Sequence, residues 1–180
     1  MKLWDDIRNY FYKRNLAERV AGLKVQRAVI NFDDTKSVGI IYDSTNPDND
    51  TIITKFAEGL RKDGKTVEIL GFVNDKKTDH KADIIVFNTK NLDWTRVPAD
   101  ERVEAFAGEN FDILLACFIG ESFPLEFVAA ISNARWRLGV YEENKTDRYD
   151  MMVKLGDKSD IQYFLEQAIY FLKQIKYDSK

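Results

Sequence analysis

Residues 37–73 constrain the fold most, because they carry the pattern of a strand, a helix and a second strand. Residues 38–42 are an almost wholly apolar run of strand length, which is typical of a strand covered on both faces in a parallel sheet. Residues 52–60 repeat apolar side chains at the spacing of one buried helix face, and the β-rich run 66–73 follows. A strand, helix and strand over about 30 residues or more form one right-handed crossover unit. The stretch therefore predicts a parallel α/β sheet.

Strand and helix patterns continue to alternate along the chain. Strands are predicted at residues 82–88, 111–118, 136–141 and 151–155, and helices near Pro98, at 124–134 and from a Ser159–Gln162 capping box to about Lys176. Residues 25–32 are a further strand candidate, and the turn-rich run 33–36 predicts a hairpin that would make it an antiparallel edge strand. We therefore expect one α/β domain over residues 25–180. It should be a three-layer Rossmann-like sandwich with a mostly parallel sheet of five to six strands.

Residues 1–24 are predicted to form an N-terminal helical arm in front of this domain. One apolar stripe runs from Leu3 to Phe11 and another from Leu16 to Leu23, and the two are out of phase across residues 13–15. We expect a bend or two short helices there. The arm packs on its own domain or on a second copy, or else its aromatic and basic residues contact a membrane. Packing is favoured, because the stripe is short and acidic residues interrupt the basic face.

Charge is unevenly distributed along the 180 residues, whose net charge is −3. Residues 1–30 hold seven bases and three acids, a local charge of +4, whereas the remaining residues hold 20 bases and 27 acids, a charge of −7. The acidic body argues against a DNA-binding surface. The basic segment is most simply a solvated helix face, and peripheral contact with anionic lipid or RNA is the alternative.

The chain shows no membrane or secretion signal. No apolar run reaches the roughly 18 residues of a membrane-spanning helix, and charges in residues 4–8 replace the apolar segment of a signal peptide. The single cysteine, Cys117, excludes an internal disulfide and is consistent with a reducing compartment. We expect a cytoplasmic protein.

Ligands of parallel sheets bind beyond the carboxyl ends of the strands, so the loops that follow the strands are where a site is expected. The first of these loops, residues 43–50, contains no glycine and three carboxylates, and would repel a phosphate. Neither G-x-G-x-x-G nor G-x-x-x-x-G-K-[ST] occurs in the chain. We expect no nucleotide and no other cofactor.

The carboxylates of this loop, Asp43, Asp48 and Asp50, are hard oxygen ligands, but they lack the order of a calcium-binding loop. Aspartate and asparagine are also the residues that helix N-caps and tight turns require, so capping is the favoured interpretation. A cysteine–histidine metal site is excluded by count, because the chain has one residue of each type. We expect no metal.

No catalytic residue is assigned. Gly120-Glu121-Ser122 is similar to part of a nucleophile elbow, but the motif needs glycine at position 124, where this chain has proline. The only histidine, His80, lies in a charged loop after a different strand. Cys117 falls near the end of a buried strand, where a free cysteine usually acts as a small hydrophobe.

These absences favour a non-catalytic α/β domain that binds a protein partner or a small ligand. The partner could be a second copy of the chain, in a homodimer formed through the N-terminal arm or the last helix. The alternative is an enzyme, or the remnant of one, that holds a small polar ligand at the strand ends. Its candidate ligand-binding residues are Asp43, Ser44, Asn46, Glu121 and Ser122.

The second half of the chain carries a spaced pattern at residues 91–94, 111–114, 122–125, 131–134, 138–139 and 149–152 (NLDW, FDIL, SFPL, ISNA, LG, YDMM). This pattern resembles that of an uncharacterised bacterial family, a domain of unknown function. The resemblance implies no activity, ligand or catalytic residue. Ala116 and Cys117 depart from it, because a polar or acidic residue is expected there.

Residues 111–114, followed by a helix and by Arg137-Leu138-Gly139, also resemble the N-terminal half of heptosyltransferase-like sugar transferases. That resemblance implies the fold. It argues against the activity, since those enzymes hold their nucleotide-sugar mainly in a second Rossmann-like domain, for which 180 residues leave no room.

Overall fold

The structure, a computed structural model, describes residues 2–76, 83–143 and 148–177. At its centre is a six-stranded sheet with the order β3-β2-β1-β4-β5-β6, in which every strand pair is parallel. The strands are β1 (Ser37–Asp43), β2 (Thr66–Val73), β3 (Ile85–Asn88), β4 (Ile113–Cys117), β5 (Trp136–Val140) and β6 (Met151–Val153).

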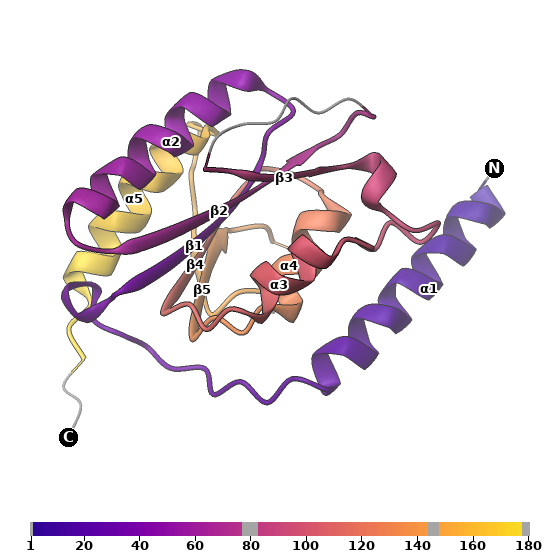
Figure 1. Cartoon of the computed structure of the whole chain (residues 1–180), viewed down its shortest axis with the longest axis horizontal. Coiled ribbons are helices and arrows are strands. Elements are labelled where there is room, and N and C mark those ends of the chain that lie inside the picture. Colours follow the sequence, from indigo (N-terminus) through magenta and orange to yellow (C-terminus); the bar gives the residue numbers. More distant parts are fainter. Residues whose placement is uncertain (1, 77–82, 144–147, 178–180) are drawn as a thin grey trace.

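Helices cover both faces of the sheet, as Figure 1 shows. On one face lie α2 (Pro47–Lys62) and α5 (Ile161–Gln174), and on the other lie α3 (Glu101–Gly108) and α4 (Phe123–Ile131), with α1 (Lys2–Ala21) packed outside α4. The central strand supplies both cores, because Ile40 faces the first layer and Ile41 the second. The three-layer Rossmann-like sandwich expected from the sequence is confirmed.

The strand order reverses between β1 and β4. The chain winds outward from β1 through β2 to β3, then returns to the other side of β1 and continues through β4, β5 and β6. In such doubly wound sheets the crevice for ligands opens at this reversal, beyond the carboxyl ends of the strands.

The prediction of an antiparallel edge strand at residues 25–32 is wrong. Residues 25–31 form neither helix nor strand, Phe32 begins the 3₁₀-helix η1 (Phe32–Asp34), and the sheet edges are the parallel strands β3 and β6. Polar groups of this segment bond to the α4–β5 loop: Ala28 N donates to Arg135 O at 3.0 Å, and the Arg27 guanidinium donates to Ser132 O at 2.8 Å. The segment therefore crosses this loop and does not pair with β1.

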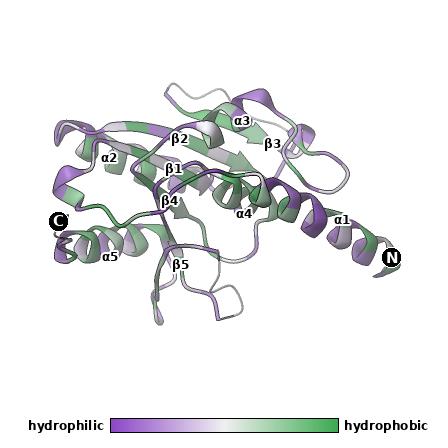
Figure 2. Cartoon of the chain, turned by 90° about the horizontal axis from the view of Figure 1, so that it is seen from below, coloured by the Kyte–Doolittle hydropathy of each residue, from purple (hydrophilic) through white to green (hydrophobic). Residues whose placement is uncertain are grey.

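The bend expected at residues 13–15 is also wrong, because α1 is one continuous helix that extends beyond the rest of the molecule (Figure 2). The only side chain of α1 that is buried is Tyr12, whose hydroxyl donates to Phe123 O at 2.8 Å. Leu16 is half-buried toward the body, while Leu3 and Trp4 are 72% and 71% exposed. The two stripes are out of phase because they serve different sides of a straight helix.

Three element boundaries differ from expectation because another residue caps the helix or ends it. The last helix is capped by Asp160, which accepts a hydrogen bond from Tyr163 N at 2.7 Å, and not by Ser159. Asp100 caps α3, so Pro98 lies before that helix, in a bridge with Leu92. Helix α4 ends at Ile131.

Among the helices that the structure describes, none combines the length and the apolar character that a membrane span requires.

Gly139 on β5 lies against the ring of Tyr149, which an added Cβ would overlap. We expect Gly139→Ala to lower the free energy of unfolding by about 1–3 kcal/mol, because the partly buried ring of Tyr149 must move or strain the strand. Urea unfolding followed by circular dichroism measures this. Gly108→Ala at the end of α3 is the control, since its Cβ would meet nothing within 4 Å. Equal stability of both variants would contradict the close packing.

Candidate functional site

The loop that follows β1 uses its polar side chains to start α2. Asn46 Oδ1 accepts a hydrogen bond from Asp48 N at 3.1 Å as the N-cap, and Pro47 occupies the first turn. Asp43 Oδ1 accepts from Thr45 N at 2.8 Å, and Asn49 Nδ2 donates to Asp43 O at 2.8 Å. Capping and turn formation, the favoured interpretation of this loop, hold for Asn46 as the cap and for Asp43 as the turn acceptor.

Asp50, in the first turn of α2, binds two hydroxyls from the end of β1. The hydroxyls of Tyr42 and Ser44 each donate to Asp50 Oδ1 at 2.6 Å, and Ser44 is only 4% exposed. Burial, and next the hydrogen bond to Asp50, raise the pKa of the Tyr42 hydroxyl above its ordinary value. Asp50 therefore ties the start of α2 to the central strand.

The polar side chains of Glu121 and Ser122, in the loop that follows β4, form fewer hydrogen bonds than those of the loop after β1. Glu121 is exposed and forms no hydrogen bond or ion pair with the described residues, and Ser122 occupies the N-cap of α4 without a side-chain cap bond. β4 is the neighbour of β1, so this loop and residues 43–50 follow adjacent strands. Within the described ranges no hydrogen bond joins the two loops. Ligand binding by the five candidate residues therefore stays a prediction.

A small hollow of about 240 Å³ lies beyond the ends of β4, β5 and β6. Gly120 and Gly156 supply backbone to its wall, while Glu142, Glu143 and Lys154 supply charge. Ligand pockets usually measure about 300–1,000 Å³, so this hollow is too small for a nucleotide. The described residues contain no group of three or more acidic, histidine or cysteine side chains able to hold a metal ion.

A buried ion pair, which the sequence analysis missed, lies on the α1 side of the sheet. Glu126 on α4 is 5% exposed and pairs with the guanidinium of Arg148. Burial, and next the charge of Glu126, raise the pKa of the nearby hydroxyls of Tyr12 and Tyr149. The feature of the sequence that could have pointed to this pair is Glu126 itself, a single acidic residue in the apolar run 123–131. The pair joins α4 to the segment before β6, because a buried carboxylate needs a countercharge.

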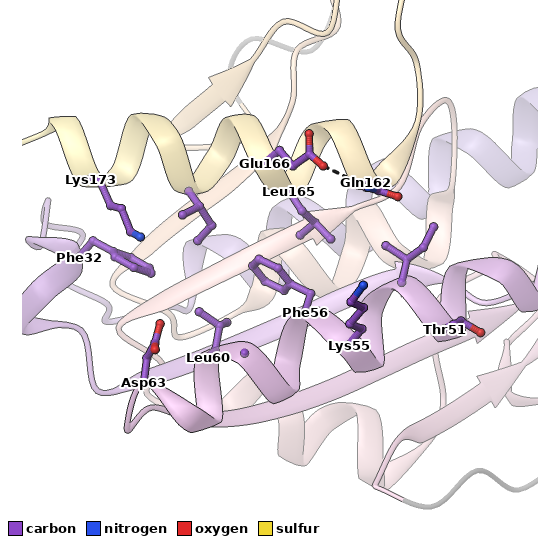
Figure 3. A pocket seen from close by; sticks show the side chains of 13 residues that line it. Phe32, Thr51, Lys55, Phe56, Leu60, Asp63, Gln162, Leu165, Glu166 and Lys173 are labelled. Atoms are coloured by element: carbon purple, nitrogen blue, oxygen red, sulfur yellow. Dashed lines mark hydrogen bonds between the residues drawn. The ribbon is translucent and has the colours of Figure 1, made fainter.

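A larger groove of about 730 Å³ separates α2 from α5 (Figure 3). Its walls are mainly apolar, and they include helix positions that the sequence pattern predicted to be buried. Ile52 and Phe56 are only partly buried, because α5 does not cover them completely. The lining residues are Phe32, Thr51, Ile52, Lys55, Phe56, Gly59, Leu60, Asp63, Gln162, Leu165, Glu166, Ile169 and Lys173.

The rims of the groove carry charges of alternating sign. Helices α2 and α5 run in the same direction, because each crosses back over a parallel sheet after a strand. Figure 3 accordingly shows Lys55 of α2 and Glu166 of α5 on opposite sides of the groove, and Asp63 of α2 and Lys173 of α5 on opposite sides at the far end. The Glu166 carboxylate accepts a hydrogen bond from Gln162 Nε2 at 3.1 Å. All four side chains belong to exposed residues. The groove is therefore an apolar centre with a positive and a negative group on each side.

The model of a family described as a family of unknown function (DUF6913) matches residues 8–175. No curated protein matches, and no solved structure matches.

Asp50→Ala should lower the free energy of unfolding by about 1–3 kcal/mol, because it removes the acceptor shared by the hydroxyls of Tyr42 and Ser44. Asp48→Ala, which removes an exposed carboxylate from the same helix turn, should cost about 0.3–1 kcal/mol at most through the helix dipole. Chemical denaturation of both variants makes the comparison. A loss from Asp50→Ala no larger than that from Asp48→Ala would contradict the structural role of Asp50.

Proposed function

We propose that this chain, which belongs to the family of unknown function DUF6913, is a non-catalytic α/β domain that acts by binding a protein. Its docking surface is the groove between α2 and α5, and the occupant is an apolar helical surface with charges of both signs at its edges. The observation that carries the proposal is the groove itself, which leaves apolar side chains of two helices partly uncovered.

The shape and chemistry of the groove favour a protein over a small molecule. Small-molecule sites enclose most of their ligand and fix it with a few convergent polar groups. Here the polar groups are spread along two helices, at Lys55 and Asp63 on one side and at Glu166 and Lys173 on the other. An apolar floor between charged rims is typical of grooves that take an amphipathic helix.

Gly59 supports the same conclusion. It lies inside α2, is exposed and lines the groove, and an added Cβ would meet nothing within 4 Å. Glycine at such a position costs about 1 kcal/mol relative to alanine, and no contact within the described chain requires it. A glycine allows the backbone of a second helix to approach α2 closely, and docking gives its presence a physical reason.

The competing proposal keeps a small polar ligand at the strand ends, bound by Asp43, Ser44, Asn46, Glu121 and Ser122. Its support is their position beyond adjacent strands. It is the weaker proposal, because Asp43 and Asn46 already serve as turn and cap acceptors and the Ser44 hydroxyl already donates to Asp50.

Site-specific photo-cross-linking in the producing cells tests the groove. p-Benzoylphenylalanine at position 51, which lines the groove, should give a protein-sized adduct on irradiation. The same group at position 101, exposed on α3 across the sheet, should give none.

Gly59→Trp, which fills the groove, should remove the adduct at position 51, whereas Gly108→Trp should leave it. Gly108 is the matched control, because it is also an exposed helical glycine with open space at its Cβ. Adducts of equal yield at positions 51 and 101, or an adduct that survives Gly59→Trp, would refute docking at the groove.

A second candidate function rests on an exposed aromatic surface at the start of α1. Leu3, Trp4, Tyr10 and Phe11 are each 40% to 72% exposed, and Trp94 packs on Phe11 with ring centroids 5.3 Å apart. The N-terminal 30 residues carry +4. Aromatic side chains beside a basic segment favour peripheral contact with an anionic membrane surface.

Sedimentation with vesicles of phosphatidylglycerol in phosphatidylcholine tests this second candidate. The double variant Leu3→Ser/Trp4→Ser should bind at least about tenfold more weakly, because each large apolar side chain contributes about 1.5–3 kcal/mol when buried. Tyr177→Ser, which removes an exposed aromatic ring next to the last helix, should bind like the wild type. Identical recovery of all three proteins would rule out the contact.

A further inference from the structure

We propose that the occupant of the α2–α5 groove is a second copy of this chain, packed about a two-fold axis that crosses both helices. This inference rests on the proposed function, since it identifies the protein that docks in the groove. It draws on the spacing of the rim charges, on the position of Gly59 and on the direction of the two helices.

The rim charges are symmetric about the middle of each helix. On α2, Lys55 and Asp63 lie at equal sequence distances from Gly59, which is midway between them. On α5, Glu166 and Lys173 lie on either side of Ile169 and Tyr170. Each helix therefore carries one cation and one anion on opposite sides of its midpoint, and the order of the signs is reversed between the two helices.

Corresponding ends of α2 and α5 lie at the same end of the groove. Figure 3 shows Thr51 of α2 at the same end as Gln162 of α5, and Asp63 at the same end as Lys173. Gly59 and Ile169 both fall between these ends. In the proposed dimer the two-fold axis runs across the groove and passes over the middle of both helices.

A second copy rotated by half a turn about that axis lies face to face with the first. Helix α2 then packs antiparallel on the α2 of the second copy, and α5 packs antiparallel on its α5. Lys55 meets Asp63 of the second copy, and Glu166 meets Lys173 of the second copy. The rotation repeats each contact, so that four ion pairs surround an apolar centre.

Gly59 then lies where the two α2 helices meet. Packed helices are usually about 8–10 Å apart, and small residues at the contact allow the shorter distances. Phe56 and Leu60 flank this point on α2, and Ile169 faces its own counterpart across the axis. The four helices form a bundle that covers the apolar surface that a single copy leaves open.

Self-complementarity is what selects a second copy over an unrelated protein. In a two-fold interface the same surface supplies both sides, so each charge needs its opposite at the symmetric position. The groove meets this condition on both helices. The two rims also sum to zero charge, so that two chains of net charge −3 meet there without local repulsion.

Sedimentation velocity of the purified full chain over a dilution series tests the inference. The wild type should show a monomer–dimer equilibrium. Lys55→Glu should raise the dissociation constant at least about tenfold, because it places like charges opposite each other twice. The double variant Lys55→Glu/Asp63→Lys restores both pairs and should return within about threefold of the wild type.

The rescue cannot come from within one chain, because positions 55 and 63 are too far apart on α2 to meet. All four positions are exposed, and circular dichroism checks that each variant is folded. Gly59→Trp should also abolish the dimer, and Gly108→Trp should not. Rescue of Lys55→Glu by Glu166→Lys in place of Asp63→Lys would overturn this axis, since the axis places position 166 against Lys173 of the second copy and predicts further weakening.

The experiment separates this inference from the function on which it rests. A monomer at every concentration, together with a groove-specific cross-link to a chain of another mass, would overturn the second copy and leave protein docking in place. A monomer with no groove-specific adduct would overturn both. A dimer that is unchanged by Lys55→Glu would place the contact elsewhere and overturn the inference.

Discussion

The rest of the structure depends on the pairing of β1 with parallel strands on both sides. Val38–Tyr42 bond to β2 on one edge and to β4 on the other, in matched register. A parallel partner on each side forces every connection to cross the sheet, so helices must cover both faces and each layer must contain helices that run in one direction. Opposite charges face each other across the groove because α2 and α5 run in the same direction. If α5 ran the other way, Lys173 would lie across from Lys55 and Glu166 across from Asp63.

Much of this architecture was predictable, and the failures have local causes. Thr66–Val73 was placed without error, because turn residues bound an unbroken β-rich run. Residues 25–32 have similar apolar content but form no strand, since Arg27 and Ala28 bond to carbonyl groups more than 100 residues away in the sequence. Strand propensity shows what a segment can do, whereas its hydrogen-bond partners are fixed only by the completed fold.

The site was less predictable than the fold. The turn role of Asp43 and the capping role of Asn46 followed from residue type alone, because few side chains accept hydrogen bonds from the free N–H groups of a turn or a helix start. The groove could not be predicted in this way, since periodicity identifies the inner face of α2 but not how far a neighbouring helix covers that face. Phe56 fits that face and is still partly open to solvent. The pair of Glu126 and Arg148 depended on a contact between segments that no local pattern relates.

The attachment of α1 has a consequence for the dynamics of the protein. Helix α1 has 20 residues but buries one side chain, Tyr12, and its other contacts with the body include the ion pairs Arg19–Glu104 and Asp5–Arg96 and the packing of Phe11 on Trp94. The sheet beneath it is held by continuous ladders. Elements with few buried contacts open in local unfolding steps at a fraction of the global free energy. We therefore expect the helix to form its own cooperative unit, with amide hydrogens that exchange with solvent well before those of β1 and β4. Opening it brings water to the nearby carboxylate of Glu126 while the sheet stays folded.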